Sequence, residues 1–145
     1  MNFTNTEREL ASQLKEVGLE WKPKIGDHYI YDLESKRDSI VTDIDHDRGD
    51  KGWIYVRSPS DGLRNINLCC WLPLWHQCRE ELQDLKWIVA SFFDLEGHIN
   101  LRIIKEKENP SQVLGIEFDV IAILDCATDL EALYKGLLEA ANQFR

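Results

Sequence analysis

Residues 87–93 read Trp-Ile-Val-Ala-Ser-Phe-Phe and are apolar on both faces of an extended chain. A short run of this kind predicts a covered central strand. Residues 94–97, Asp-Leu-Glu-Gly, predict a turn, and further strands are predicted over 99–105 and 113–124, separated by the break Asn-Pro-Ser at 109–111. Successive strands with short connections predict an antiparallel meander.

A helix signal follows the meander. Thr128 and Glu131 have the spacing of a capping box, in which each side chain bonds the backbone N–H of the other residue. The next residues carry a broad apolar stripe at helical spacing, made of Leu130, Leu133, Tyr134, Leu137, Leu138 and Ala141. Residues 87–144 therefore predict a unit of three strands and a closing helix.

Period-two patterning also dominates residues 21–72. A strand is predicted over 28–31, and the segments 39–44 and 53–57 predict a hairpin because both are rich in β-branched and aromatic residues and flank a polar stretch. Alternating residues predict another strand over 64–70. Short strands with brief connections predict a curled sheet or a small, partly open barrel.

Two more helices are predicted. Residues 6–17 begin with Thr6 and Glu9 at capping-box spacing and stop at Gly18. The other helix covers residues 73–84, with a proline in its first turn. This helix is predicted to be amphipathic, because five residues at helical spacing fall on one face: Trp71, Trp75, Cys78, Leu82 and Leu85.

Together these patterns predict an α+β fold. Antiparallel meandering sheets are covered by the amphipathic helices 73–84 and 128–143, with the N-terminal helix at the side. The chain has 145 residues, which is the size of one globular domain, so we expect residues 1–145 to form a single compact domain.

Charge and composition exclude several functions. The 17 Lys and Arg residues face 26 Asp and Glu residues, and a net charge of −9 argues against nucleic acid as a partner. No stretch approaches the roughly 18 apolar residues that span a bilayer. Without a secretion signal, the four cysteines are expected to be reduced thiols of a cytoplasmic protein. No glycine-rich phosphate or dinucleotide motif is present, so no cofactor is predicted.

One acidic segment has the alternation of a calcium loop. Asp43, Asp45 and Asp47 occupy its first, third and fifth positions. The motif fails at the sixth and twelfth positions, where Arg48 and Ile54 replace the required Gly and Glu. The segment is therefore interpreted as a charged hairpin connection that would hold a divalent ion only weakly.

A second metal candidate combines thiols with an imidazole, at Cys69, Cys70, His76 and Cys78. The set lacks a Cys-x-x-Cys pair, and adjacent residues on a strand point to opposite faces. The alternatives are a zinc site, which would support a small metal-assisted hydrolase using His76 and the cysteines, and ordinary packing of buried thiols.

The C-terminal part resembles two groups of proteins. Residues 87–145, with the helix start Asp-Cys-Ala-Thr-Asp-Leu-Glu-Ala-Leu at 125–133, resemble the HicB-type antitoxin fold, which implies an antitoxin-like or anti-defence role. HicB-type proteins often carry a DNA-binding tail as well, and none follows the helix here. The chain also resembles a loose set of uncharacterised bacterial and phage-associated small proteins, which adds the segments 21–27 and 71–73 and implies no activity.

These observations predict a non-enzymatic binding or interaction protein of bacterial or mobile-element origin that forms a homo-oligomer. Trp71 and Trp75 are the interface candidates, since large aromatic rings are enriched at interfaces. The first alternative is an antitoxin-like protein that docks on a basic protein partner, because opposite potentials select such a partner. The second alternative is the metal-assisted hydrolase.

Overall fold

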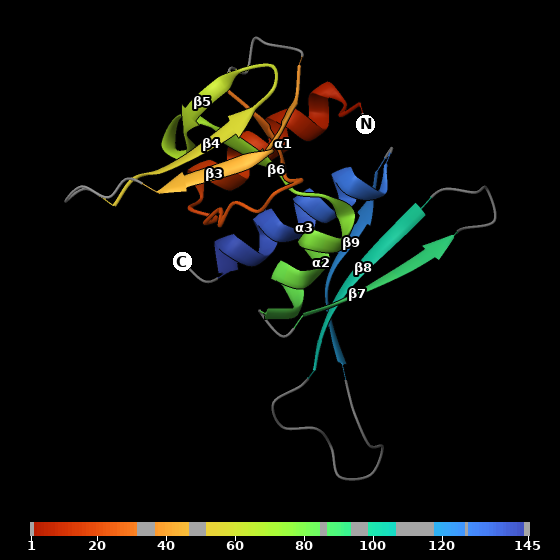
Figure 1. The fold of residues 1–145 in the computed structure, drawn as a ribbon. Helices are drawn as coiled ribbons and strands as arrows, with labels where there is room; N and C mark the ends of the chain where they lie inside the picture. The colour runs from red at the N-terminus through yellow and green to blue at the C-terminus, as the bar shows by residue number, and fades with distance from the viewer. Residues whose placement is uncertain are drawn as a thin grey trace. The chain divides into compact units, whose positions relative to one another are not determined.

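The structure, a computed structural model, describes residues 2–31, 37–46, 52–84, 87–93, 99–106, 118–126 and 128–143. The chain divides into two compact units, residues 1–74 and residues 75–145. Both units combine helix and antiparallel sheet, so the predicted α+β class is confirmed (Figure 1). The expectation of a single domain stays a prediction.

The first unit opens with helix α1, Asn5–Glu16. Its N-cap is Thr4, whose hydroxyl accepts a hydrogen bond from the Glu7 N–H at 3.1 Å, while the Thr4 N–H donates to the Glu7 carboxylate at 2.8 Å. The predicted box at Thr6 and Glu9 is therefore wrong by two residues. The same spacing occurs twice within residues 4–9, and a start at Thr4 lets Phe3 enter the core.

The end of α1 confirms the prediction at Gly18, which has a φ of 87°. Its N–H donates to the Lys15 carbonyl, and the Leu19 N–H donates to the Leu14 carbonyl, both at 3.0 Å. This pair of bonds is a Schellman motif, and the left-handed backbone that it needs favours glycine.

Two three-stranded antiparallel sheets follow in the first unit. In one sheet, β1 (His28–Ile30) lies between β2 (Ser39–Ile40) and β6 (Cys70–Leu72). In the other sheet, β4 (Ile54–Ser58) lies between β3 (Asp43–His46) and β5 (Gly62–Asn65). A core cluster of Tyr29, Val41, Val56 and Cys69 takes residues from both sheets.

The segment predicted as one strand over 39–44 is two strands that belong to different sheets. Between them, Val41 is completely buried, its N–H donates to the Asp27 carbonyl at 2.9 Å and its carbonyl accepts from the Gly26 N–H at 2.8 Å. These bonds to the loop before β1 divide the strand. The second half of the predicted hairpin is confirmed, because β3 pairs with β4 from Asp43↔Arg57 to His46↔Ile54.

The predicted strand over 64–70 is also interrupted. A turn of 3₁₀ helix, η1 (Ile66–Leu68), separates β5 from β6, and the Asn65 side chain accepts from the Asn67 N–H at 3.0 Å. An asparagine that bonds the backbone two residues on favours a turn over a continued strand. Trp71 consequently lies in β6, so its predicted place on the face of the next helix is wrong.

The second unit contains helix α2 (Trp75–Asp84), strands β7 (Trp87–Phe93), β8 (Ile99–Glu106) and β9 (Phe118–Asp125), and helix α3 (Asp129–Gln143). The strands form the predicted meander, with β8 rather than β7 in the centre. Helix α2 packs on α3 and β7, and α3 packs on β8 and β9, so two helices cover this sheet (Figure 1). The Thr128 hydroxyl accepts from the Glu131 N–H at 3.0 Å, as predicted.

Candidate binding pocket

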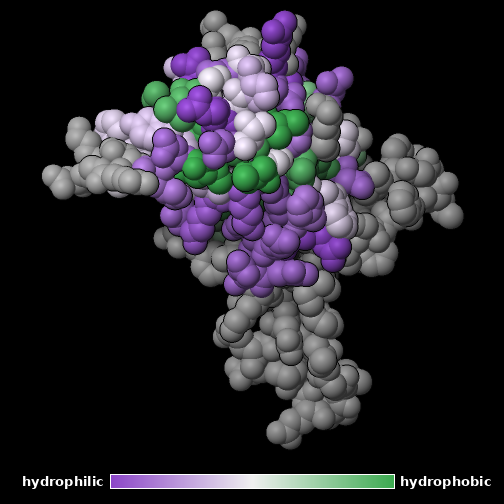
Figure 2. All heavy atoms as spheres, in the orientation of Figure 1, coloured by the Kyte–Doolittle hydropathy of each residue, from purple (hydrophilic) through white to green (hydrophobic). Residues whose placement is uncertain are grey.

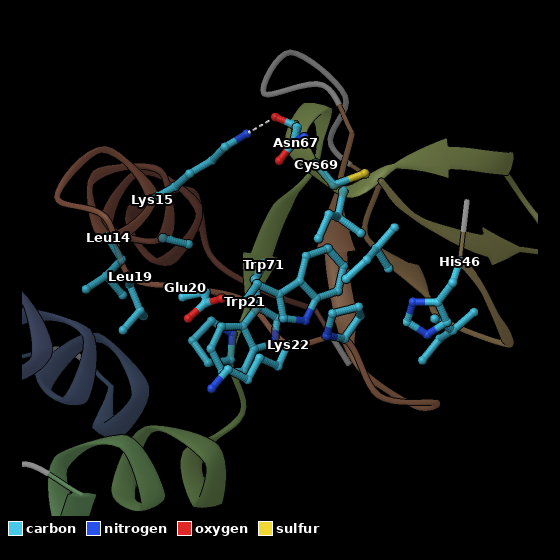
Figure 3. Close-up of a pocket in the computed structure, with 16 residues that line it drawn as sticks. Leu14, Lys15, Leu19, Glu20, Trp21, Lys22, His46, Asn67, Cys69 and Trp71 are labelled. Atoms are coloured by element: carbon cyan, nitrogen blue, oxygen red, sulfur yellow. Dashed lines mark hydrogen bonds between the residues drawn. The ribbon is translucent and has the colours of Figure 1, made fainter. Parts of the chain in front are cut away.

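The first unit contains a cavity of about 520 Å³ (Figure 3). Its walls come from α1, the segment before β1, the facing ends of β3 and β4, η1 and β6. Apolar side chains dominate the wall, among them Leu14, Leu19, Ile44, Ile54 and Ile66. Figure 2 shows apolar side chains gathered in a band on the same unit, with polar side chains around them.

Two indole rings form the most ordered wall of the cavity. Trp21 and Trp71 lie parallel, with ring centroids 6.5 Å apart and an interplanar angle of 7° (Figure 3). Trp21 also contacts Tyr29 at 5.8 Å between centroids, and Tyr29 belongs to the core cluster. The aromatic wall therefore rests on the core of the unit.

The position of Trp21 depends on a buried carboxylate. One oxygen of Asp27, a residue that is 2% exposed, accepts hydrogen bonds from Trp21 Nε1 at 2.8 Å and from the Lys24 N–H at 2.9 Å. The Asp27 carbonyl also accepts from the Val41 N–H. Asp27 thus folds the loop back and fixes the indole, which makes it a positioning residue of the pocket.

The second indole has an unused donor. Trp71 Nε1 is buried, and no atom of the described residues accepts its hydrogen bond. A buried donor without an acceptor costs about 1–3 kcal/mol, and an indole nitrogen can only donate. This nitrogen has almost no accessible surface, so Trp71 contributes its ring and not its N–H to the wall of the cavity.

Charged side chains line the cavity together with the apolar wall. They are Lys15, Glu20 and Lys22, and the His46 side chain lies in the same wall. The Lys15 ammonium donates to the Asn67 carbonyl at 2.8 Å and joins α1 to η1 (Figure 3). Lys22 is exposed and has no hydrogen bond or ion pair to any residue in the described ranges.

The predicted thiol and imidazole ligands are divided between the two units. Cys69 and Cys70 belong to the first unit, whereas His76 and Cys78 belong to helix α2 of the second unit. Among the residues that the structure describes, no three His, Cys, Asp or Glu side chains form a group that could hold a metal ion. Linear spacing alone suggested this cluster.

The thiols are held in their protonated form. Burial raises the pKa of Cys69 to about 12 and the pKa of Cys70 to about 11. Burial also raises the pKa of the fully buried Cys78 thiol, and Glu81 adds to this shift. Because the thiolate is the nucleophile and the metal ligand, these cysteines behave as packing residues near neutral pH.

The predicted calcium-loop carboxylates lie on and beyond β3. Asp43 and Asp45 are exposed, and Asp43 accepts a hydrogen bond from the Ile44 N–H at 2.9 Å. Asp47 lies outside the described residues. His46 follows Asp45 on the strand and lines the pocket, a role that the sequence analysis did not assign.

The second interface candidate, Trp75, is the first residue of α2 and is 39% exposed. The guanidinium of Arg79 lies over its ring, 4.7 Å from the centroid. This is a cation–π contact between residues one helical turn apart. Trp71 and Trp75 are therefore in different settings, one in a pocket wall and one on a helix surface.

Comparisons with protein-family models, with curated proteins and with solved structures find no match for this chain. The resemblance to HicB-type antitoxins and to the bacterial and phage-associated set stays a prediction. None of the helices in the described part of the chain is both long enough and apolar enough to cross a membrane.

Proposed function

We propose that this chain is a non-enzymatic binding protein and that its first unit captures a small ligand in the pocket walled by Trp21 and Trp71. The observation that carries the proposal is the pair of parallel indole rings in the wall of a largely apolar cavity. Ligand pockets are mostly apolar, have volumes of roughly 300–1,000 Å³ and present a few placed polar groups. The cavity of about 520 Å³ has these properties.

The chemistry of the pocket favours binding over catalysis. Among the described residues, Cys69 is the one thiol in its wall; a pKa of about 12 keeps this thiol protonated, and its Sγ donates to the Asn65 carbonyl at 3.4 Å. A protonated, hydrogen-bonded thiol is a weak nucleophile. The same property argues against the alternative of a hydrolase that uses the cysteines.

A fragment screen followed by NMR tests this function. In a ¹⁵N-labelled protein, pocket ligands are expected to shift the indole N–H signals of Trp21 and Trp71 and to leave that of Trp53, which does not line the pocket, unchanged. Single Trp→Phe variants assign the signals. If no fragment at millimolar concentration shifts the Trp71 signal, the proposed binding function is wrong.

We also propose that the exposed Trp75 and the half-buried Arg79 over its ring form part of a contact between two copies of the chain. Tryptophan and arginine are the residues most enriched among those that dominate interface energies. Trp53 provides a matched control, because it is also 39% exposed. In sedimentation velocity, Trp75→Ala is expected to shift the protein toward the monomer and Trp53→Ala is not; a wild-type monomer at all concentrations would refute the contact.

The predicted antitoxin-like role is retained as a further proposal. Its support is the net charge of −9, most of which the second unit carries, together with the resemblance of that unit to HicB-type proteins. A basic protein would be the partner, since opposite potentials accelerate association. Capture of such a partner must weaken as salt rises; capture that is indifferent to salt would contradict the proposal.

A further inference from the structure

We propose that the ligand of the Trp21 and Trp71 pocket is an uncharged, planar aromatic molecule. This inference rests on the proposed binding function and adds the chemical class of the ligand. It depends on three observations: the two indole planes are parallel, neither indole nitrogen is free to bond a ligand, and the charged residues of the wall are exposed to solvent.

The two tryptophans offer a ligand their carbon surface. Both residues are half-buried and line the cavity. Trp21 Nε1 already donates to the Asp27 carboxylate at 2.8 Å, and Trp71 Nε1 is shielded from the cavity and from solvent. Because an indole has no other hydrogen-bonding atom, a ligand needs no acceptor group to match these rings.

The parallel rings favour a flat ligand. The planes of Trp21 and Trp71 differ by only 7°, so a flat ring that stacks on one indole is also aligned with the other. Stacked and edge-on contacts between aromatic rings contribute about 0.5–1.5 kcal/mol beyond burial of apolar area. A saturated ring of the same size would bury a similar area and lose this contribution.

The rest of the wall suits an uncharged ring. Its half-buried apolar side chains are Leu19, Ile44, Ile54 and Ile66. The Cys69 thiol in the same wall carries no charge near neutral pH, because burial raises its pKa to about 12. Contact with these groups stabilises a bound ligand through burial of its apolar surface, which contributes roughly 25 cal/mol per Å².

The charged residues of the wall do not require a charge on the ligand. Lys15, Glu20 and Lys22 are exposed, as is His46. The Lys15 ammonium donates to the Asn67 carbonyl and extends away from the two indoles (Figure 3). A charged ligand would lose part of its hydration on entering the apolar cavity, and this loss opposes binding unless a partner compensates it. The cavity therefore favours a neutral ligand.

A matched series of probes tests the ligand class in calorimetric titrations of the full chain. The probes are 1-naphthylmethanol, the anion 1-naphthylacetate, the cation 1-naphthylmethylammonium and the saturated analogue decahydro-1-naphthylmethanol. We expect naphthylmethanol to bind at least tenfold more tightly than either ion and several-fold more tightly than the saturated analogue. Its affinity should not weaken as salt rises, and its binding should have a negative heat-capacity change, the mark of apolar burial.

Variants of Trp71 separate the role of the ring from that of the N–H. Trp71→Phe keeps an aromatic ring and removes the N–H, and it is expected to bind naphthylmethanol within about threefold of the wild type. Trp71→Leu keeps apolar bulk without a ring and is expected to weaken binding about tenfold. A Trp71→Phe variant that binds as weakly as Trp71→Leu would contradict the inference.

Three further variants locate the binding without changing an indole. Ile54→Thr keeps a branched side chain but adds a hydroxyl to the wall, and it should weaken naphthylmethanol binding several-fold. Ile25→Thr makes the same change at a side chain that is 72% exposed and outside the wall, so it is the control and should bind as the wild type does. Lys22→Met should also leave the affinity unchanged, because the ligand carries no charge.

The outcomes distinguish the two proposals. If either ion or the saturated analogue binds as tightly as naphthylmethanol, the inferred ligand class is wrong while the binding function stands. If naphthylmethanol binds and neither Trp71→Leu nor Ile54→Thr changes its affinity, the site is elsewhere and the inference is wrong. If none of the four probes binds, the inference is wrong, and the NMR fragment screen decides the binding function separately.

Discussion

The carboxylate of Asp38 lies 3.0 Å from Nδ1 of His28, and both side chains are mostly shielded from solvent. On its other oxygen, the same carboxylate meets the Arg8 guanidinium at 3.7 Å. The ring of Phe3 covers His28 edge-on, with centroids 5.5 Å apart. This cluster connects α1 to β1 and to the segment before β2, so it stabilises the first unit rather than forming part of the pocket.

Removal of this carboxylate is predicted to destabilise the protein. Asp38→Ala removes an acidic partner of the mostly buried Arg8, and a broken buried ion pair costs about 3 kcal/mol. Urea denaturation measures the loss. Glu9→Ala removes an exposed carboxylate from the same helix and should change the free energy of unfolding by less than about 0.5 kcal/mol. Equal effects of the two variants would contradict the role of Asp38.

The N-cap of α1 can be tested with two neighbouring threonines. Thr4→Ala removes the hydroxyl that accepts from the Glu7 N–H and should lower the free energy of unfolding by about 1 kcal/mol. Thr6→Ala is expected to be neutral or slightly stabilising, because Thr6 is exposed inside the helix and alanine has the higher helix propensity. If Thr6→Ala lowers the thermal stability more than Thr4→Ala does, the N-cap is Thr6 and this prediction is wrong.

Asp27 is predicted to act on the pocket through Trp21. Asp27→Ala leaves Trp21 Nε1 and the Lys24 N–H without their acceptor and should cost about 2 kcal/mol of stability. Its specific signature is an upfield shift of the Trp21 indole N–H in the NMR spectrum. Asp27→Asn retains a side-chain oxygen and should restore most of that shift. An unchanged Trp21 signal in Asp27→Ala would show that the carboxylate does not hold the ring.

The buried thiols predict a loss of stability in alkali. Burial raises the pKa of Cys69 from 9.0 to about 12 and that of Cys70 from 9.0 to about 11. The folded state therefore binds these protons more tightly than the unfolded state, and its advantage is complete below pH 9 and falls as the pH rises toward 12. Burial shifts the pKa of Tyr29 upward as well, which adds to the same trend.

Urea denaturation between pH 8 and 11 measures this dependence. The free energy of unfolding should decline above pH 9 in the wild type and decline less steeply in Cys69→Ala and Cys70→Ala. Both variants start from a lower stability, so the slope against pH is the quantity to compare. A slope that is identical in the variants and the wild type would show that the thiols are not responsible.

Local sequence signals predicted the second unit better than the first. The apolar run at 87–93, the strand pattern at 99–105 and the helix start at Thr128 each specify one element without reference to distant residues, and the structure has these two strands, the helix and the Thr128 half of its capping box. The sequence predicts β7 as the central strand of the meander, whereas β8 is central, and this error has a simple cause. A run that is apolar on both faces predicts burial, and helices can cover both an edge strand and a central one.

Errors in the first unit arise where distant residues decide the backbone. Nothing in the pattern of 39–44 shows that Val41 bonds the loop at Gly26 and Asp27, and the period-two pattern of 64–70 continues through the turn that Asn65 begins. The candidate site also depends on residues that are far apart in the sequence. The large ring of Trp71 makes it a candidate from the sequence alone, but its partner Trp21 and the carboxylate that holds Trp21 precede it by more than forty residues.

The double hydrogen bond between Val41 and the loop at Gly26 and Asp27 has one more consequence. The loop at Gly26 and Asp27 bonds the main chain at the end of β2, and the Asp27 carboxylate in the same loop holds the ring of Trp21. Loosening of this loop would therefore affect the strand and the ring together. Occupation of the cavity should therefore slow deuterium uptake at the Val41 and Gly26 amides, although neither residue lines it. The main chain at Val41 and Gly26 would then report on a ligand that it does not contact.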